Sequence, residues 1–245
     1  KMHCKILAVV AMSLAGLSVG GEDFPFDDPG AGAEAEERAL GVNEGRLHFL
    51  TEPPQRAVHH HRNRILITAS SLDGGWVGLE QCHHHLDPVP ASEVVYRAER
   101  VRALRILVST NIGESWVEGA SVQLRDVRPG ASLCVAAQSR ALHPLAEGGY
   151  RLRNGPYLRR FLDGYYPMRV SLDIRYPDDR IRLVAFAPPD QAGFRVHAEP
   201  GRIRAEAWFE GRLFTQFDFC RRDASTCPQE PRAASSAGSG VAFGP

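Results

Sequence analysis

The chain alternates apolar and polar residues over many short stretches, and turn signals rich in Gly, Pro and Asp separate them. In Val170–Tyr176 every second residue is apolar, so Val170, Leu172, Ile174 and Tyr176 fall on one face of an extended strand. No comparably long stretch has the period of a helix. The pattern predicts an all-β protein built as an antiparallel β-sandwich.

Composition and turn signals divide the chain into five segments. We expect a signal peptide at 1–21, a flexible acidic leader at 22–45, a β-sandwich domain at 46–145, a second β unit at 148–220 and a disordered C-terminal tail at 221–245. The alternative for the middle of the chain is that both β units complete one larger sandwich.

The N-terminal residues predict the compartment. A basic start, an apolar run at Ile6–Val19 and small residues before Glu22 make the layout of a secretory signal peptide. The run is shorter than the ~20 residues that a membrane-spanning helix needs. We therefore expect a periplasmic or secreted protein with no membrane span after cleavage near Gly20 or Gly21.

Cysteine usage fits that compartment. One of the five cysteines, Cys4, falls in the expected signal peptide, and disulfides are the default for the other four after export. Three connectivities are open, and we favour Cys82–Cys134 with Cys220–Cys227. The absence of a C-x-x-C-H motif excludes covalent attachment of a c-type haem.

The order Cys82, Trp116, Cys134 is similar to that of immunoglobulin domains. However, Trp116 lies too far from Cys82, and no tyrosine precedes Cys134 by two residues. The predicted sandwich is immunoglobulin-like only in the generic sense.

Two histidine triplets, His59–His61 and His83–His85, stand out among the ten histidines. The segment between them has the pattern of a β-hairpin turning at Asp73-Gly74, which brings both triplets to the same open end. Because residues i and i+2 share a face, His59 with His61, and His83 with His85, form pairs that converge on one ion. Neutral imidazoles suit copper and zinc. Asp87 is a fifth ligand or a partner that fixes a histidine tautomer.

Two other interpretations of the triplets remain open, a polar strand edge and a pH-sensitive partner surface. The register is also open. Ile65, Ile67, Val77 and Leu79 define one set of inward positions, whereas burial of Cys82 requires the opposite parity, and a slip of one residue exchanges the two faces.

The sequence lacks common catalytic motifs. It contains no G-x-S-x-G nucleophile elbow, no H-E-x-x-H, no Walker A loop and no strand-linked G-x-G-x-x-G. A formal net charge of zero gives no case for nucleic-acid binding. We expect a non-catalytic accessory or interaction module that contacts an envelope protein or a polysaccharide. The alternatives are a protein that handles copper, zinc or non-covalent haem through the histidine triplets, and a hydrolase without a recognisable motif.

Overall fold

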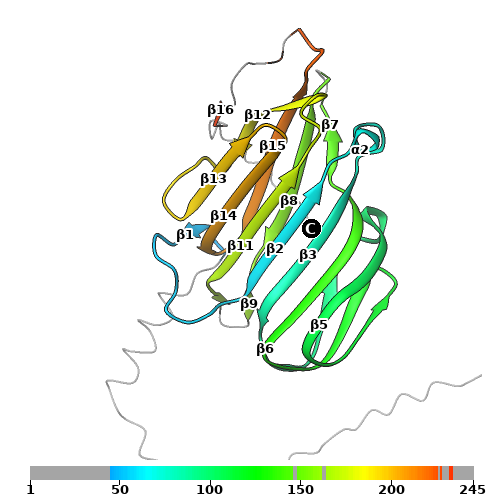
Figure 1. The fold of residues 1–245 in the computed structure, drawn as a ribbon. Helices are drawn as coiled ribbons and strands as arrows, with labels where there is room; N and C mark the ends of the chain where they lie inside the picture. The colour runs from blue at the N-terminus through cyan, green and yellow to red at the C-terminus, as the bar shows by residue number, and fades with distance from the viewer. Residues whose placement is uncertain (1–44, 146–147, 162–163, 226, 228–231, 234–245) are drawn as a thin grey trace, which may run out of the picture. The chain divides into compact units, whose positions relative to one another are not determined.

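The computed structural model describes residues 45–145, 148–161, 164–225, 227 and 232–233 (Figure 1). The expected signal peptide, the leader up to residue 44 and most of the expected tail lie outside these residues. Within the described ranges, neither short helix has the length and apolar character of a membrane span.

The described residues are mostly β-strand, with one short α-helix and one 3-10 turn. In chain order the elements are β1 (His48–Phe49), β2 (His60–Leu66), α2 (Ala69–Gly74), β3 (Trp76–Leu86), β4 (Val89–Val95), η1 (Ala98–Arg100), β5 (Val101–Glu118), β6 (Ser121–Arg140), β7 (Leu142–Pro144), β8 (Tyr150–Tyr157), β9 (Arg160–Phe161), β10 (Gly164–Tyr165), β11 (Met168–Arg175), β12 (Ile181–Ala187), β13 (Phe194–Glu199), β14 (Arg202–Glu210), β15 (Leu213–Arg221) and β16 (Arg232–Ala233).

The strands form two main sheets that pack face to face, so the predicted all-β sandwich is confirmed (Figure 1). The nine-stranded sheet has the order β1-β14-β11-β2-β3-β6-β4, with β13 also paired to β14 and β5 also paired to β6. The five-stranded sheet has the order β16-β12-β15-β8-β7.

The two segments 46–145 and 148–220 contribute to the same sheet. Strand β11 lies between β14 and β2, and it runs parallel to β2, with Arg169 beside His60 and Arg175 beside Leu66. This pair is an exception to the antiparallel pattern expected from the sequence.

The main core follows the predicted alternation. Val170, Leu172 and Ile174 of β11 are buried, and they share one hydrophobic cluster with Phe217 and Phe219 of the other sheet. Each fully buried side chain of this size contributes about 1.5–3 kcal/mol of transfer free energy. The core therefore joins strands from distant parts of the chain.

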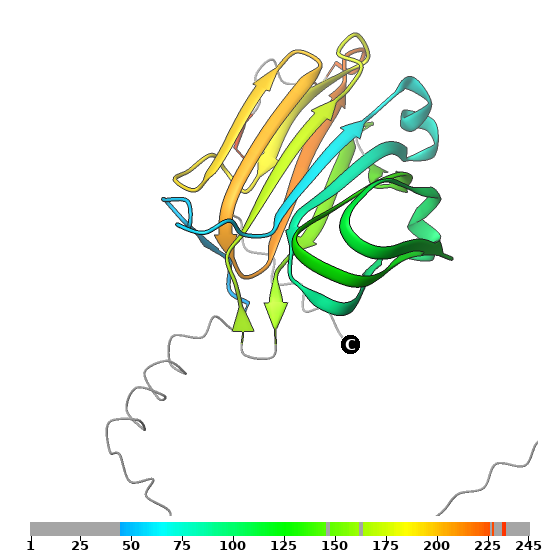
Figure 2. The same cartoon turned by 60° about the horizontal axis from the view of Figure 1, so that its bottom comes forward.

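Beyond β3 the nine-stranded sheet curls, and the long hairpin of β5 and β6 bends round at its end (Figure 2). The curled end encloses a second, smaller hydrophobic cluster that includes Val122, Leu124, Leu133 and Val135. The sandwich thus contains two apolar regions, and the central strands β2 and β3 lie close to where they meet.

The Pro129-Gly130 dipeptide has the composition of a turn but lies within β6. Pro129-Gly130 does not reverse the chain, because Val127 and Ser132 on its two sides both pair with the same strand, β5. The residues between them form a bulge, in which Gly130 supplies a left-handed backbone conformation at φ 74. Because β5 pairs with β6 on both sides of this dipeptide, the extra residues bulge out of the strand instead of turning it.

The connection between the histidine triplets also differs from the prediction. The chain passes through α2 instead of a tight turn at Asp73-Gly74. The backbone N–H of Thr68 donates to Ser71 Oγ at 2.9 Å where the helix begins, and Gly75 ends it with φ 73. The helix uses more chain than a tight turn, which changes the register of the strands that follow.

Both favoured cysteine pairs are present. Cys82 of β3 is joined to Cys134, its direct partner on β6, and Cys220 near the end of β15 is joined to Cys227. The first link lies within a sheet and the second holds the chain beyond the last long strand.

Candidate functional site

Both histidine triplets lie at one end of the central strands of the nine-stranded sheet. His60 pairs with His84 and His61 with His83, directly across β2 and β3. A tight turn at Asp73-Gly74, as the sequence predicted, would place His59–His61 opposite Leu86–Pro88, and this pairing does not form because α2 replaces the turn.

The triplets divide between the two faces of the sheet because side chains alternate along a strand. On the inner face, His61 contacts Tyr157 of the five-stranded sheet edge to face, at 4.9 Å between ring centroids. His83, opposite His61, shares this face, whereas His60 and His84 lie on the outer face. Val77 and Leu79 of β3 face the inner side, whereas Cys82 is buried on the outer face of the sheet. Both sets of positions inferred from the sequence are therefore covered, on opposite faces.

Three imidazoles gather on the inner face, and we call His59, His61 and His83 the inner histidine cluster. His59 Nε2 lies 3.0 Å from His83 Nδ1. The ring centroids of His61 and His83 are 4.4 Å apart, and those of His59 and His61 are 6.3 Å apart. Strand pairing thus brings residues from both triplets together, as the sequence predicts for three of the four histidines.

A hydrogen-bond chain fixes the tautomer of His83. Its Nε2 lies 3.2 Å from Gln81 Oε1, which also accepts a hydrogen bond from the Tyr96 hydroxyl at 2.6 Å. An amide oxygen only accepts, so a neutral His83 donates from Nε2 and carries a lone pair on Nδ1. That lone pair faces the His59 ring, in the middle of the cluster.

Burial keeps the cluster uncharged. It lowers the pKa of His61 from 6.5 to about 3 and that of His59 to about 4, and it holds the pKa of His83 well below its usual value. On the outer face, burial lowers the pKa of His60 to about 4, and the nearby Arg169 adds to the effect. All four rings are therefore neutral at pH 7, the form in which imidazole binds metals.

One nitrogen of the cluster lacks a well-aligned partner. His61 Nε2 is buried and has no hydrogen-bond partner of ordinary geometry within the described part of the chain, although a hydrogen bond with the Asn63 side chain raises the pKa of His61. Buried polar atoms are nearly always paired in native proteins, because an unpaired one costs about 1–3 kcal/mol. A metal ion beside His83 would reach this nitrogen only after the His61 ring turned away from Asn63.

The remaining two predicted ligands do not join the cluster. Asp87 accepts two hydrogen bonds from the Arg159 guanidinium, at 2.6 and 3.0 Å, so its carboxylate is occupied. His85 is exposed, with φ 55, in the bulge between His84 and Leu86. No hydrogen bond or ring contact connects it to another histidine of the described residues.

The outer face holds a second group of ligand types, which the sequence did not predict. Cys82, His84 and Cys134 are the one group among the described residues that brings three ligand atoms within 4.8 Å of one another. The His84 ring lies 5.7 Å from that of His60, centroid to centroid. The two cysteines form the β3–β6 disulfide, so their sulfurs are not thiolates in this state.

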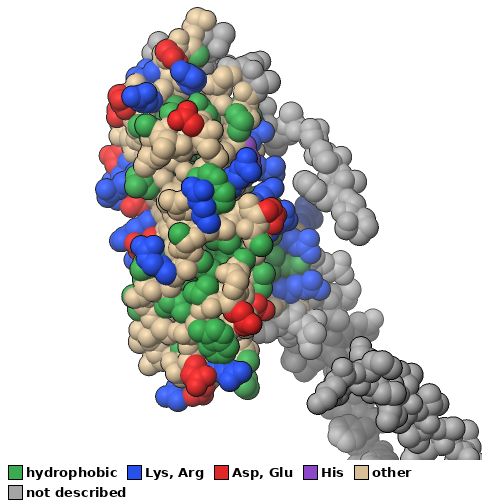
Figure 3. Space-filling view, turned by 90° about the vertical axis from the view of Figure 1, so that its right-hand side faces the viewer, with side chains coloured by type: hydrophobic (Ala, Val, Ile, Leu, Met, Phe, Trp, Pro, Cys, Tyr) green, Lys and Arg blue, Asp and Glu red, His purple; other side chains and the backbone are tan. Residues whose placement is uncertain are grey.

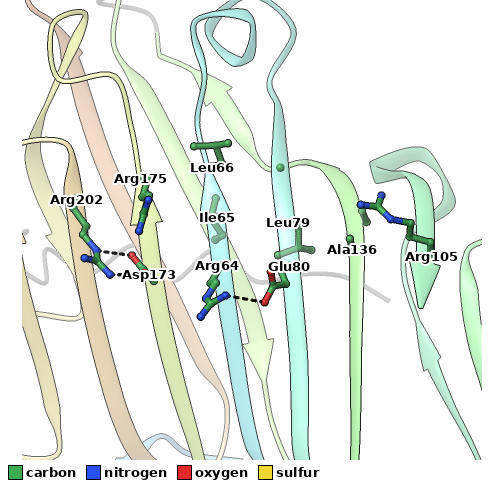
Figure 4. Close-up of a pocket in the computed structure, with 12 residues that line it drawn as sticks. Arg64, Ile65, Leu66, Leu79, Glu80, Arg105, Ala136, Asp173, Arg175 and Arg202 are labelled. Carbon is green, nitrogen blue, oxygen red and sulfur yellow. Dashed lines mark hydrogen bonds and ion pairs between the residues drawn. The ribbon is translucent and has the colours of Figure 1, made fainter. Parts of the chain in front are cut away.

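Farther along the outer face, charged side chains line a shallow groove across β2, β3 and β11 (Figure 4). Arg64 pairs with Glu80 at 3.2 Å, and Arg202 pairs with Asp173 at 2.8 Å. Exposed pairs of this kind contribute about 0–1 kcal/mol each. The groove contains no histidine, and its two carboxylates pair with two of its four arginines, which leaves a net charge of +2 from Arg105 and Arg175. For metal binding, the histidine end remains the stronger candidate.

Sequence reasoning missed the residues that support the cluster. Gln81 lies two positions before His83, so its place on the same face was available from the strand period. Tyr96 reaches the site from just beyond β4 and Tyr157 from β8, and no local pattern connects them to the triplets.

The arrangement can bind a transition metal through neutral imidazoles. In comparisons with protein-family models and with curated proteins, the chain has no match.

Proposed function

We propose that the protein is an exported metal-binding protein that holds one copper or zinc ion at the inner histidine cluster. The observation that carries the proposal is the close approach of His59 Nε2 and His83 Nδ1, at 3.0 Å, beside the buried ring of His61, whose centroid lies 4.4 Å from that of His83. The two disulfides are compatible with export, and the periplasm is the compartment we propose.

The distance between His59 and His83 suits a shared ion. Two nitrogens bound to one tetrahedral zinc at ~2.0–2.1 Å lie about 3.3 Å apart. His59 Nε2 and His83 Nδ1 are 3.0 Å apart, so an ion that displaces the bridging proton requires little movement of either ring. His61 must turn toward them, because the three nitrogens do not yet lie within 4.8 Å of one another.

Neighbouring groups prepare the cluster for this role. Gln81 holds His83 in the tautomer that leaves Nδ1 free, as partners of metal-bound histidines generally do. Asp87, held by Arg159, stays near His59 and favours positive charge there, and it acts in this proposal as a neighbour rather than a ligand.

Calorimetry on the oxidised, tag-free protein tests the proposal. We expect about one equivalent of Cu²⁺ or Zn²⁺ to bind, and the His59→Ala/His61→Ala/His83→Ala variant to lose at least about tenfold in affinity. The matched control is His85→Ala/His143→Ala/His197→Ala, which removes three histidines outside the cluster and should bind as the parent does. Circular dichroism verifies that both variants are folded, and equal affinities in the two variants would contradict the proposal.

A second candidate function, the interaction module, is favoured by the curled end of the sheet. Large hydrophobic side chains are exposed there on β4 and β5, with Val95 at 70 % and Leu107 and Val108 at 45 % exposure. Figure 3 shows hydrophobic side chains gathered on this side of the molecule. Exposed apolar patches on edge strands commonly mark surfaces that bind other proteins.

The module proposal predicts that Leu107→Lys/Val108→Lys abolishes capture of an envelope protein that the parent chain captures by cross-linking. Phe214→Lys is the control, since Phe214 is exposed to a comparable degree, at 52 %, but lies on the five-stranded sheet. If both variants capture the same protein as the parent does, the curled end is not the contact surface.

A further inference from the structure

The histidine-bearing strands also bring cysteines and histidines together on the outer face, opposite the inner histidine cluster. Cys82 and Cys134 are direct partners across β3 and β6, and His84 follows two positions after Cys82 on the same face. The two sulfurs and a nitrogen of His84 lie within 4.8 Å of one another. Strand pairing alone therefore holds three metal-ligand types at one point.

We propose that the Cys82–Cys134 pair, once reduced, binds one zinc ion together with His84. The same cross-strand link between β3 and β6 then exists in two forms, a disulfide and a metal bridge. The proposal goes beyond the metal-binding function given above, because it uses no residue of the inner histidine cluster.

The step balances with a dithiol as reductant. The dithiol gives up two electrons and two protons and becomes a disulfide, the Cys82–Cys134 bond breaks, and two thiols remain. Zinc then displaces both thiol protons and binds the two thiolates at about 2.3 Å and the imidazole at about 2.0–2.1 Å. The two negative charges of the thiolates balance the two positive charges of the zinc ion.

Nearby side chains suit thiolate chemistry. Arg62 Nη2 lies 3.3 Å from Cys82 Sγ, close enough to donate a hydrogen bond to a thiolate and to favour its formation. Ser132 Oγ lies 3.2 Å from His84 Nδ1 and orients the ring. A Cys₂His set leaves one position of a tetrahedral site open, and His60, whose ring lies beside that of His84, is the candidate for it.

The reduced site differs from the inner histidine cluster in the metal ions that it selects and in the absorption spectrum of bound Co²⁺. Thiolates are soft ligands that select zinc and similar ions, and they give bound Co²⁺ intense charge-transfer absorption that imidazoles do not. This difference separates the two sites in one experiment.

The experiment uses the full chain with Cys220→Ala/Cys227→Ala, so that Cys82 and Cys134 are the pair under test. The protein is reduced with dithiothreitol, desalted without oxygen and titrated with Co²⁺ and then Zn²⁺. We expect a thiolate–cobalt band at one equivalent in the reduced protein, none in the oxidised protein, and loss of the band as Zn²⁺ displaces Co²⁺.

Matched variants make the result specific. His84→Ala should weaken Zn²⁺ binding by at least about tenfold, whereas His85→Ala, one residue away and exposed, should leave it unchanged. His59→Ala/His61→Ala/His83→Ala should keep the thiolate band, so this site and the inner cluster fail or succeed separately. No thiolate band in the reduced, folded protein, or equal effects of His84→Ala and His85→Ala, would overturn the proposal.

Circular dichroism accompanies each titration, because reduction removes a cross-link. If the reduced chain unfolds, recovery of the β-sheet signal on addition of one equivalent of Zn²⁺ supports the proposal, since binding would then drive folding. An unfolded chain that zinc does not refold would overturn it.

Discussion

Lowering the pH from 7 to 4 is expected to reduce the free energy of unfolding of the metal-free protein by several kcal/mol. The inner histidines are neutral in the fold, with the pKa of His61 lowered from 6.5 to about 3 and that of His59 to about 4 by burial. Between these values and 6.5 the unfolded chain binds more protons than the folded one. Stability is therefore complete above about pH 6.5 and falls as the pH drops toward 4.

The size of the effect follows from the buried rings. One pKa unit corresponds to about 1.4 kcal/mol, so His61 alone accounts for on the order of 3–5 kcal/mol at low pH. His60 contributes less, because its ring is half-exposed and solvent screens its charge. The carboxyl of Asp173, whose pKa is lowered by its hydrogen bonds to Arg202, titrates below this window and does not obscure it.

Urea titrations followed by circular dichroism at pH 7, 6, 5 and 4.5 measure the effect. The His61→Gln variant should show a flatter dependence on pH than the parent, whereas His197→Gln, at an exposed histidine, should not change the slope. A parent protein whose stability is constant from pH 7 to pH 4.5 would show that the inner rings are not buried as neutral groups.

Removal of the two disulfides is expected to have unequal effects. Cys82 and Cys134 are 52 residues apart in the sequence and Cys220 and Cys227 are 7 apart, so the first link restricts the unfolded chain more. The chain-entropy relation gives losses of about 4 kcal/mol for Cys82→Ala/Cys134→Ala and about 2 kcal/mol for Cys220→Ala/Cys227→Ala. Alanine is the appropriate replacement for the first pair, because both cysteines are buried and serine would leave its hydroxyl unpaired.

The comparison is made by urea unfolding of both double variants at pH 7.5, with the parent protein as reference. Both variants should remain folded in the absence of urea. A larger loss from the Cys220–Cys227 pair than from the Cys82–Cys134 pair would mean that contacts near the end of β15, rather than chain entropy, dominate the effect of that link.

Local sequence patterns predicted the features that depend on strand period. The alternation in Val170–Tyr176 identified one face of β11 correctly. The Cys82–Cys134 pairing followed from two predicted strands, and the Cys220–Cys227 pairing followed from the short segment between these two cysteines at the end of the last strand. The pairing of β11 with β2 was not predictable in this way. It is parallel and joins distant parts of the chain, and no turn between the two strands constrains their register.

The strand period also predicted part of the candidate site, but it did not predict the positions of His85 and Asp87. His59, His61 and His83 share a face because of the strand period and the hairpin. His85 does not join them because a bulge at φ 55 takes it out of the alternation, and no residue type at that position signals a bulge. The pairing of Asp87 with Arg159 depends on a residue 72 positions away.

The position of β11 beside β2 has a consequence for how the molecule assembles over time. His60 on β2 contacts Ser171 on β11 across 111 residues of sequence. Strand β2 therefore cannot acquire both of its neighbours until the chain has been made beyond Arg175, and closing so long a loop slows the formation of the sheet. Until then one edge of β2 stays unpaired, and an unpaired strand edge is open to pairing with other chains.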